Sequence, residues 1–207
     1  MCPDAVLRGW EDGGVSISAS HELVVGARER RAGRVILLNG TSSSGKTSIA
    51  EELLATLDGA WYHLGVDGFH RARNRRDWTD ETFLPVFQRT VLGFHRAVAG
   101  MASAGNDVVV DHILGERWRL ADCLATFEGF PVLFVGVRCS LPELERRERE
   151  RGNRTIGRAA VQFPLVHDHA VYDVEVDSEL QTPAECAAQI RERLDEGPPT
   201  AFDRLRS

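Results

Sequence analysis

A glycine-flanked polar loop between two apolar segments constrains this chain more than any other feature of its sequence. Residues 34–39, RVILLN, have the length and composition of a buried strand. The segment GTSSSGKT, residues 40–47, follows directly and fits the pattern G-x-x-x-x-G-K-[ST] at every position. Apolar residues then recur at helical spacing, at Ile49, Leu53, Leu54 and Leu57. A strand, this loop and an amphipathic helix in that order predict a phosphate-binding loop.

The residue types of the loop suit a bound polyphosphate. Glycines at both ends let successive backbone N–H groups turn toward one site, and the following helix adds its positive dipole end. Lys46 is predicted to reach the β- and γ-phosphates, and the Thr47 hydroxyl to bind Mg²⁺. The predicted nucleotide-binding residues of the loop are Gly40, Thr41, Ser42, Ser43, Ser44, Gly45, Lys46 and Thr47. The alternative is a serine-rich loop without a ligand.

The rest of the chain alternates apolar runs with amphipathic segments. Strands are predicted at 34–39, 60–66, 107–113, 131–139 and 170–177, and helices at 46–57, 83–105, 116–127, 141–152 and 182–194. Near-continuous Val, Ile and Leu in the strands favour a parallel sheet with helices on both faces. We therefore predict an α/β fold with a five-stranded parallel sheet, one domain over residues 34–207, and an N-terminal extension over residues 1–33.

Composition narrows the class of partner. The chain has 207 residues, a formal net charge of −6 and 43% hydrophobic residues, so it can build a full core but is a poor match for nucleic acid or an anionic membrane. Its four cysteines are too scattered for a metal cluster or a disulfide framework. Without an apolar segment of membrane-spanning length, we expect a cytoplasmic protein that binds a small molecule. Homo-oligomerisation is left open.

Two acidic residues end predicted strands. Asp111 ends the third, where it is expected to hold Mg²⁺ directly or through water; the alternative is a simple strand cap. Asp67 follows the second, between two glycines. Because the carboxyl ends of parallel strands open onto one crevice, Asp67 is expected to face the loop and accept a proton from a substrate hydroxyl. The alternative is a turn-forming aspartate before glycine.

An arginine-rich stretch, ELERRERERGNRTIGRA, follows the fourth strand. In a small kinase, a mobile lid at this place contributes arginines to the transferring phosphoryl group. Arg151, Arg154 and Arg158 flank a glycine-containing break and are predicted to contact phosphate, with Arg154 also catalytic. Arg147 and Arg149 are assigned to a solvated, salt-bridged helix face, which is the alternative for the whole stretch. The guanine-reading motif N-K-x-D is missing, which disfavours a GTPase.

Together these segments resemble the chloramphenicol phosphotransferases, small P-loop kinases that phosphorylate a hydroxyl of an antibiotic. The similar stretches are VILLNGTSSSGKTSIA, LGVDGF, ERWR, FVGVRC, ERGNRTIGRAAVQ and VHDHAVYDVEVD, in that order, over about residues 34–195. The resemblance implies ATP and Mg²⁺ as cofactors, Lys46 and Thr47 for phosphate and metal, Asp67 as general base, and a lid around Arg154.

Two departures bear on the acceptor. His112 stands beside Asp111 where paired acids are expected; it could bind substrate, or satisfy a backbone carbonyl. Residues 68–87, GFHRARNRRDWTDETFLPVF, hold four arginines, although the pocket of a neutral, compact antibiotic should be mostly apolar. A larger, more polar or anionic acceptor fits these residues better, and the alternative is a solvated loop beside an apolar pocket. The predicted substrate contacts are Asp67, Phe69, His70, Arg71, Trp78 and His112.

The sequence thus predicts an ATP-dependent O-phosphotransferase that acts on a hydroxyl of a small-molecule antibiotic, for resistance or self-protection. Two alternatives stay open: a kinase of a sugar or nucleoside, and a non-catalytic, nucleotide-dependent regulatory protein. A pure binder would not need a carboxylate at Asp67.

Overall fold

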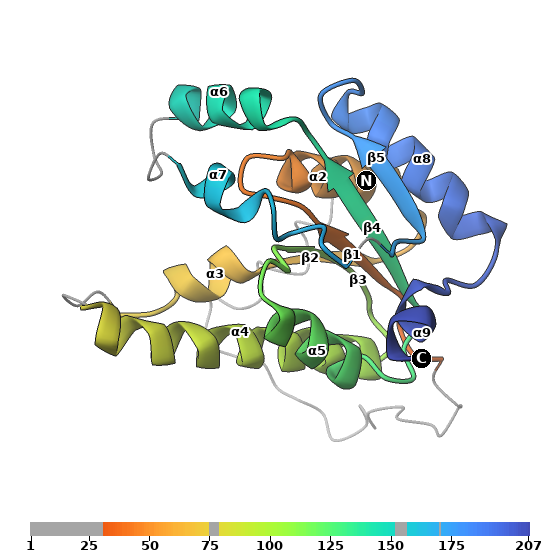
Figure 1. The fold of residues 1–207 in the computed structure, drawn as a ribbon. Helices are drawn as coiled ribbons and strands as arrows, with labels where there is room; N and C mark the ends of the chain where they lie inside the picture. The colour runs from red at the N-terminus through yellow and green to blue at the C-terminus, as the bar shows by residue number, and fades with distance from the viewer. Residues whose placement is uncertain (1–30, 75–78, 152–156, 170) are drawn as a thin grey trace, which may run out of the picture. The chain divides into compact units, whose positions relative to one another are not determined.

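The fold is built on a parallel sheet, as a computed structural model of the chain shows (Figure 1). The structure describes residues 31–74, 79–151, 157–169 and 171–207. Within these residues the sheet has five strands, all parallel, in the order β2-β3-β1-β4-β5. The strands are β1 (Val35–Asn39), β2 (Trp61–Gly65), β3 (Asp107–His112), β4 (Val132–Arg138) and β5 (Val174–Asp177). The predicted five-stranded parallel sheet is confirmed.

Helices cover both faces of the sheet, which explains why its strands are nearly continuously apolar. Ile36 and Leu38 of β1 face α2 (Lys46–Thr56) and α8 (Pro183–Glu196). Val35 and Leu37 face the other side, which α4 (Asp80–Ser103), α5 (Arg117–Thr126) and α9 (Ala201–Arg206) cover. Figure 1 shows these two layers of helices on opposite sides of the sheet. Period-two alternation along each strand therefore fills two separate apolar cores.

Three short helices were not predicted: α3 (Val66–Arg71), α7 (Arg158–Gln162) and α9. Each has five or six residues, too few for a helical repeat of apolar residues to be visible in the sequence. The remaining helix, α6 (Leu141–Arg151), lies where it was predicted. Thr182 caps α8, because its side chain accepts from the Glu185 N–H and the Glu185 side chain accepts from the Thr182 N–H.

Two element boundaries differ from the prediction for identifiable reasons. Helix α4 begins at Asp80 rather than residue 83, because Thr79 and Thr82 form a capping box that starts the helix before Pro85. Strand β5 begins at Val174, since the Asp173 carboxylate accepts from the N–H groups of Phe134 and Thr200 and so acts as a local cap. Side-chain hydrogen bonds to the backbone thus lie at both boundaries, within one turn of chain at α4 and between distant segments at β5.

The sheet carries the site at the carboxyl ends of its strands. Asp111 of β3 lies in register with Leu38 of β1 on one side and Gly65 of β2 on the other. The loops after β1, β2 and β3 therefore leave the sheet at one edge, as expected for a parallel α/β fold. In the described part of the chain, no helix has both the length and the apolar character needed to cross a membrane.

Candidate active site

The phosphate loop leaves β1 after Asn39 and ends where α2 begins at Lys46. Both of its glycines are required by geometry. A side chain at Gly40 would place its Cβ 2.7 Å from the Val137 carbonyl oxygen, and Gly45 has a φ of 83°, in the left-handed region that favours glycine. The Lys46 ammonium lies back across the loop and donates to the Thr41 carbonyl at 2.6 Å. The fold thus holds the predicted loop with its cation inside it.

Beside the loop, two side chains converge on one carboxylate oxygen. The Thr47 hydroxyl donates to Oδ2 of Asp111 at 2.6 Å, and Nε2 of His63 lies 3.6 Å from the same oxygen. Burial would raise the pKa of Asp111, but the nearby His63, the charge of Lys46 and the Thr47 hydroxyl outweigh it and hold the pKa well below its usual value. Asp111 is therefore an anion at neutral pH.

A hydroxyl and an ionised carboxylate are the hard oxygen ligands that Mg²⁺ prefers, so Thr47 and Asp111 fit the predicted metal. His63 was missed from the sequence. The one available signal was an imidazole inside the otherwise apolar strand WYHLG, two residues before the strand ends.

Asp67 lies in the first turn of α3. It was predicted to follow the strand directly, but β2 ends at Gly65 and Val66 lies between them. Asp67 lines two hollows. One is lined by the phosphate loop and by Asp111, and the other is a pocket of about 550 Å³ that also contains His63, Phe69 and Arg71. The structure thus brings Asp67, Phe69 and Arg71 of the predicted site together at a pocket adjoining the phosphate loop.

His70 does not line that pocket. Its ring stacks on Phe87 of α4, with centroids 5.0 Å apart and planes within 4°. Burial and then the nearby Arg73 lower the pKa of His70, so its ring is neutral and packs as an aromatic side chain. Trp78, together with residues 75–77, lies outside the described residues, and its predicted role stays a prediction.

His112 borders the hollow of the phosphate loop, but its side chain is fully buried and its ring lies against His95 of α4. Its Nε2 lies 3.0 Å from Nε2 of His95, whose Nδ1 lies 2.6 Å from a carboxylate oxygen of Asp122. This arrangement fits the alternative of a buried structural histidine, although the partner is a second histidine and not a carbonyl.

The sulfur of Cys123 also lies 3.4 Å from Nε2 of His95, so these groups resemble metal ligands. However, a histidine that binds a metal normally donates its second N–H, and Nδ1 of His112 has no partner among the described residues. We therefore interpret the Asp122–His95–His112 chain as a hydrogen-bonded support beneath the end of β3.

The arginines after β4 divide into two groups. Arg154 lies outside the described residues, as does the side chain of Arg151, and Arg158 is exposed on α7. Their predicted phosphate contacts stay predictions. Arg147 pairs with Glu143 at 2.7 Å, as its assignment to a salt-bridged face requires.

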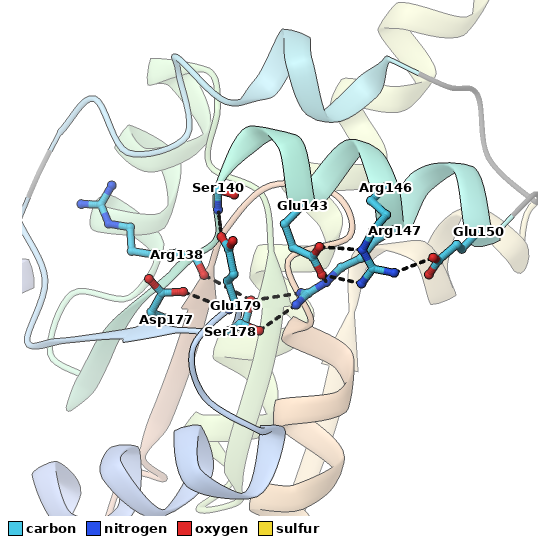
Figure 2. Close-up of polar contacts among 9 residues, drawn as sticks. All are labelled: Arg138, Ser140, Glu143, Arg146, Arg147, Glu150, Asp177, Ser178 and Glu179. Carbon is cyan, nitrogen blue, oxygen red and sulfur yellow. Dashed lines mark hydrogen bonds and ion pairs between the residues drawn. The ribbon is translucent and has the colours of Figure 1, made fainter.

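Arg147 also does more than that assignment foresaw. Its Nη2 donates to the Ser178 carbonyl at 2.7 Å, so its guanidinium joins α6 to the turn after β5 (Figure 2). There it lines a pocket of about 400 Å³ with Ser43 and Gly45 of the phosphate loop and with Gln181 and Pro183. An arginine within a run of alternating Arg and Glu gives no sequence signal of this second contact.

A buried amide just before the loop was also missed. Asn39 is fully buried, donates to the Val166 carbonyl and to the Tyr172 hydroxyl, both at 2.8 Å, and accepts from the Leu114 N–H at 2.9 Å. It therefore ties the end of β1 to the segments after β3 and before β5. The signal in the sequence was the polar last residue of RVILLN.

The sheet order and the loop between its central strand and α2 define the P-loop kinase fold. Solved structures agree. The Mycobacterium tuberculosis APS kinase CysC, in complex with AMPPNP and APS, matches with a TM-score of 0.64 and 18% identity over 79% of this chain and 98% of its own. A gluconokinase from Sinorhizobium meliloti 1021 matches with a TM-score of 0.57 and 20% identity, over 85% of this chain and 97% of its own. The Deinococcus radiodurans tunicamycin resistance protein matches with a TM-score of 0.59 and 14% identity, over 80% of this chain and 98% of its own.

The chain belongs to the family described as "Chloramphenicol phosphotransferase-like protein", whose model matches residues 33–195. A Mycobacterium tuberculosis protein of strain H37Rv named "Putative O-phosphotransferase" is 34% identical and covers 84% of this chain and 88% of its own length. Its counterpart in strain CDC 1551 matches equally. The predicted family and enzyme class are confirmed: the chain is a phosphotransferase with the P-loop kinase fold.

Proposed function

We propose that the enzyme transfers the γ-phosphoryl group of ATP to a hydroxyl of a small-molecule antibiotic. The observation that carries this proposal is the position of Asp67, which lines both the hollow of the phosphate loop and the adjoining pocket of about 550 Å³. A hydroxyl bound in that pocket would lie between a general base and the phosphoryl group it attacks.

The donor would bind along the phosphate loop. Its phosphates would meet the backbone N–H groups of the loop and the Lys46 ammonium, and its base would enter the pocket between Arg147 and Pro183. Thr47 and Asp111 would hold Mg²⁺, which when bound neutralises phosphate charge. ATP as donor would also place the reaction in the cytoplasm.

The chemical step follows from this arrangement. The acceptor oxygen forms a bond to the γ-phosphorus while the bond from that phosphorus to the bridging oxygen of ADP breaks. The hydroxyl proton passes to the Asp67 carboxylate, and ADP leaves with the electron pair of the broken bond. Positioning by the loop and charge neutralisation by Lys46 would supply most of the rate, and the proton transfer a smaller share.

The pocket beside Asp67 favours a polar acceptor. His63, Arg71 and Asp111 line it together with Phe69, so it offers charged and polar groups as well as one aromatic face. This mixture supports a hydroxyl-rich antibiotic over a compact apolar one. The family description and the tunicamycin resistance protein among the similar folds support an antibiotic.

The same polar lining, with a gluconokinase among the similar folds, supports a second candidate, a kinase of a sugar or nucleoside. A coupled assay of ADP formation, with mass detection of products, separates the two. The panel would hold chloramphenicol, tunicamycin, hydroxyl-rich antibiotics, free sugars and nucleosides. A phosphorylated antibiotic supports the proposal, a phosphorylated sugar or nucleoside alone supports the second candidate, and no product from any acceptor contradicts both.

A further inference from the structure

We propose that Gln162 is a further phosphate-contacting residue, which donates a hydrogen bond from its side-chain amide to the γ-phosphoryl group. This inference rests on the proposed use of a nucleoside triphosphate, and it adds a neutral donor that lies outside the loop motif. Gln162 is the last residue of α7, the short helix that follows the arginine-rich stretch after β4.

The first step is a direct contact with the loop. The backbone N–H of Ser42 donates to Oε1 of Gln162 at 2.8 Å. Ser42 is buried and is the third residue of the phosphate loop. Gln162 therefore joins α7 to the loop across 120 residues of sequence.

The contact fixes which way the amide faces. A backbone N–H can only donate, so the atom opposite it must be the side-chain oxygen, and the NH₂ group must point away from Ser42. Apart from the Ser42 N–H, the side chain of Gln162 has no hydrogen-bond partner among the described residues, and it is half-exposed. The amide thus presents two oriented N–H donors to an accessible space beside the loop.

Gln162 is joined to the γ-phosphate end of the loop through Ser42, although Gln162 itself is not among the residues that line the hollow there. Ser42 lines the hollow that also contains Asp67 and Asp111, whereas the pocket assigned to the base touches Ser43 and Gly45 but not Ser42. The Ser42 N–H is occupied by Gln162, so the phosphates are left with the donors that follow it in the loop. An amide held at this end adds a hydrogen bond that only a nucleotide with a γ-phosphate can use.

The competing explanation is that Gln162 only anchors α7. Gln162→Glu separates the two roles, because the carboxylate still accepts from the Ser42 N–H but replaces the NH₂ donors with negative charge. We expect the Kd of ATP to rise about 10- to 100-fold, since a hydrogen bond to a charged group is lost, while the Kd of ADP changes less than about threefold. Gln162→Met, which loses both functions, should also weaken ATP more than ADP.

Titration calorimetry with Mg²⁺ and each nucleotide measures these constants. Gln88→Glu, which adds the same charge at an exposed position of α4, should leave the ratio of the two Kd values unchanged. A ratio in Gln162→Glu equal to that of the unaltered protein, or an equal loss of both nucleotides in Gln162→Met, overturns the inference. Failure of the unaltered protein to bind either nucleotide would instead contradict the proposed function itself.

Discussion

Replacing Asn39 by Ala should destabilise the protein strongly, although the residue touches no proposed substrate. The substitution removes the one partner that the structure gives, within the described residues, to the buried Leu114 N–H. It also removes a hydrogen bond to the buried Val166 carbonyl, which keeps a contact with the His169 side chain. Leaving the buried Leu114 N–H unsatisfied costs about 1–3 kcal/mol and losing the hydrogen bond to Val166 about 1 kcal/mol more, so the free energy of unfolding should fall by roughly 2–4 kcal/mol. The Tyr172 hydroxyl adds little to this loss, because it keeps His167 as a partner.

Urea denaturation followed by circular dichroism measures the change, with Tyr172→Phe as the matched comparison. That variant removes one hydroxyl from the same network and leaves the Val166 and Leu114 contacts of Asn39 in place. It should cost about 1 kcal/mol. The reasoning is refuted if Asn39→Ala costs no more than Tyr172→Phe, because the buried backbone groups would then have found other partners.

Three further predictions follow from the site and from the buried histidines. Asp67→Asn should lower kcat by ~100-fold or more while the Kd of ATP stays nearly unchanged, and near-normal turnover would exclude Asp67 as the base. Arg147→Ala should raise the KM for ATP by about 10-fold. The comparison is Arg146→Ala, because Arg146 pairs with Glu143 and Glu150 but does not itself line the pocket; equal effects would remove Arg147 from the base site. Burial and then the charge of Arg138 lower the pKa of His167 to about 3, so the unfolded chain takes up a proton near pH 6.5 that the folded chain does not. Stability should therefore fall as the pH drops from 6.5 toward 3, by at most ~1.4 kcal/mol per pH unit from this group; His167→Gln should flatten the slope in urea titrations, and an unchanged slope would contradict the assignment.

Patterns that are local in the sequence predicted the parallel sheet and the phosphate loop. Strand, glycine-flanked loop and helix come in one uninterrupted stretch, so the motif by itself assigns Lys46 and Thr47 to a phosphate loop. The strand-ending position of Asp111 predicted its place beside the loop for a similar reason, because parallel strands bring their carboxyl ends to one edge. Its metal-binding role stays a prediction. Resemblance over residues 34–195 then supplied the family, which the family model and the Mycobacterium tuberculosis relatives confirm.

Contacts between distant segments could not be predicted in this way. Arg147 reaches Ser178 and Gln162 reaches Ser42, and nothing in either neighbourhood of the sequence marks these pairs. His112 shows that being next to a site residue in the sequence can also mislead. Its place beside Asp111 suggested the site, yet the alternation of side chains along β3 turns it into the opposite face, toward His95.

The measurement that tests the account most directly is the fate of the γ-phosphoryl group of oxygen-18-labelled ATP. The label should appear in a phosphate ester whose bridging oxygen comes from the acceptor hydroxyl, and Asp67→Asn should form that ester at least ~100-fold more slowly. Release of all label as inorganic phosphate, at the same rate with and without acceptors, would contradict the account, because the pocket beside Asp67 would then hold only water.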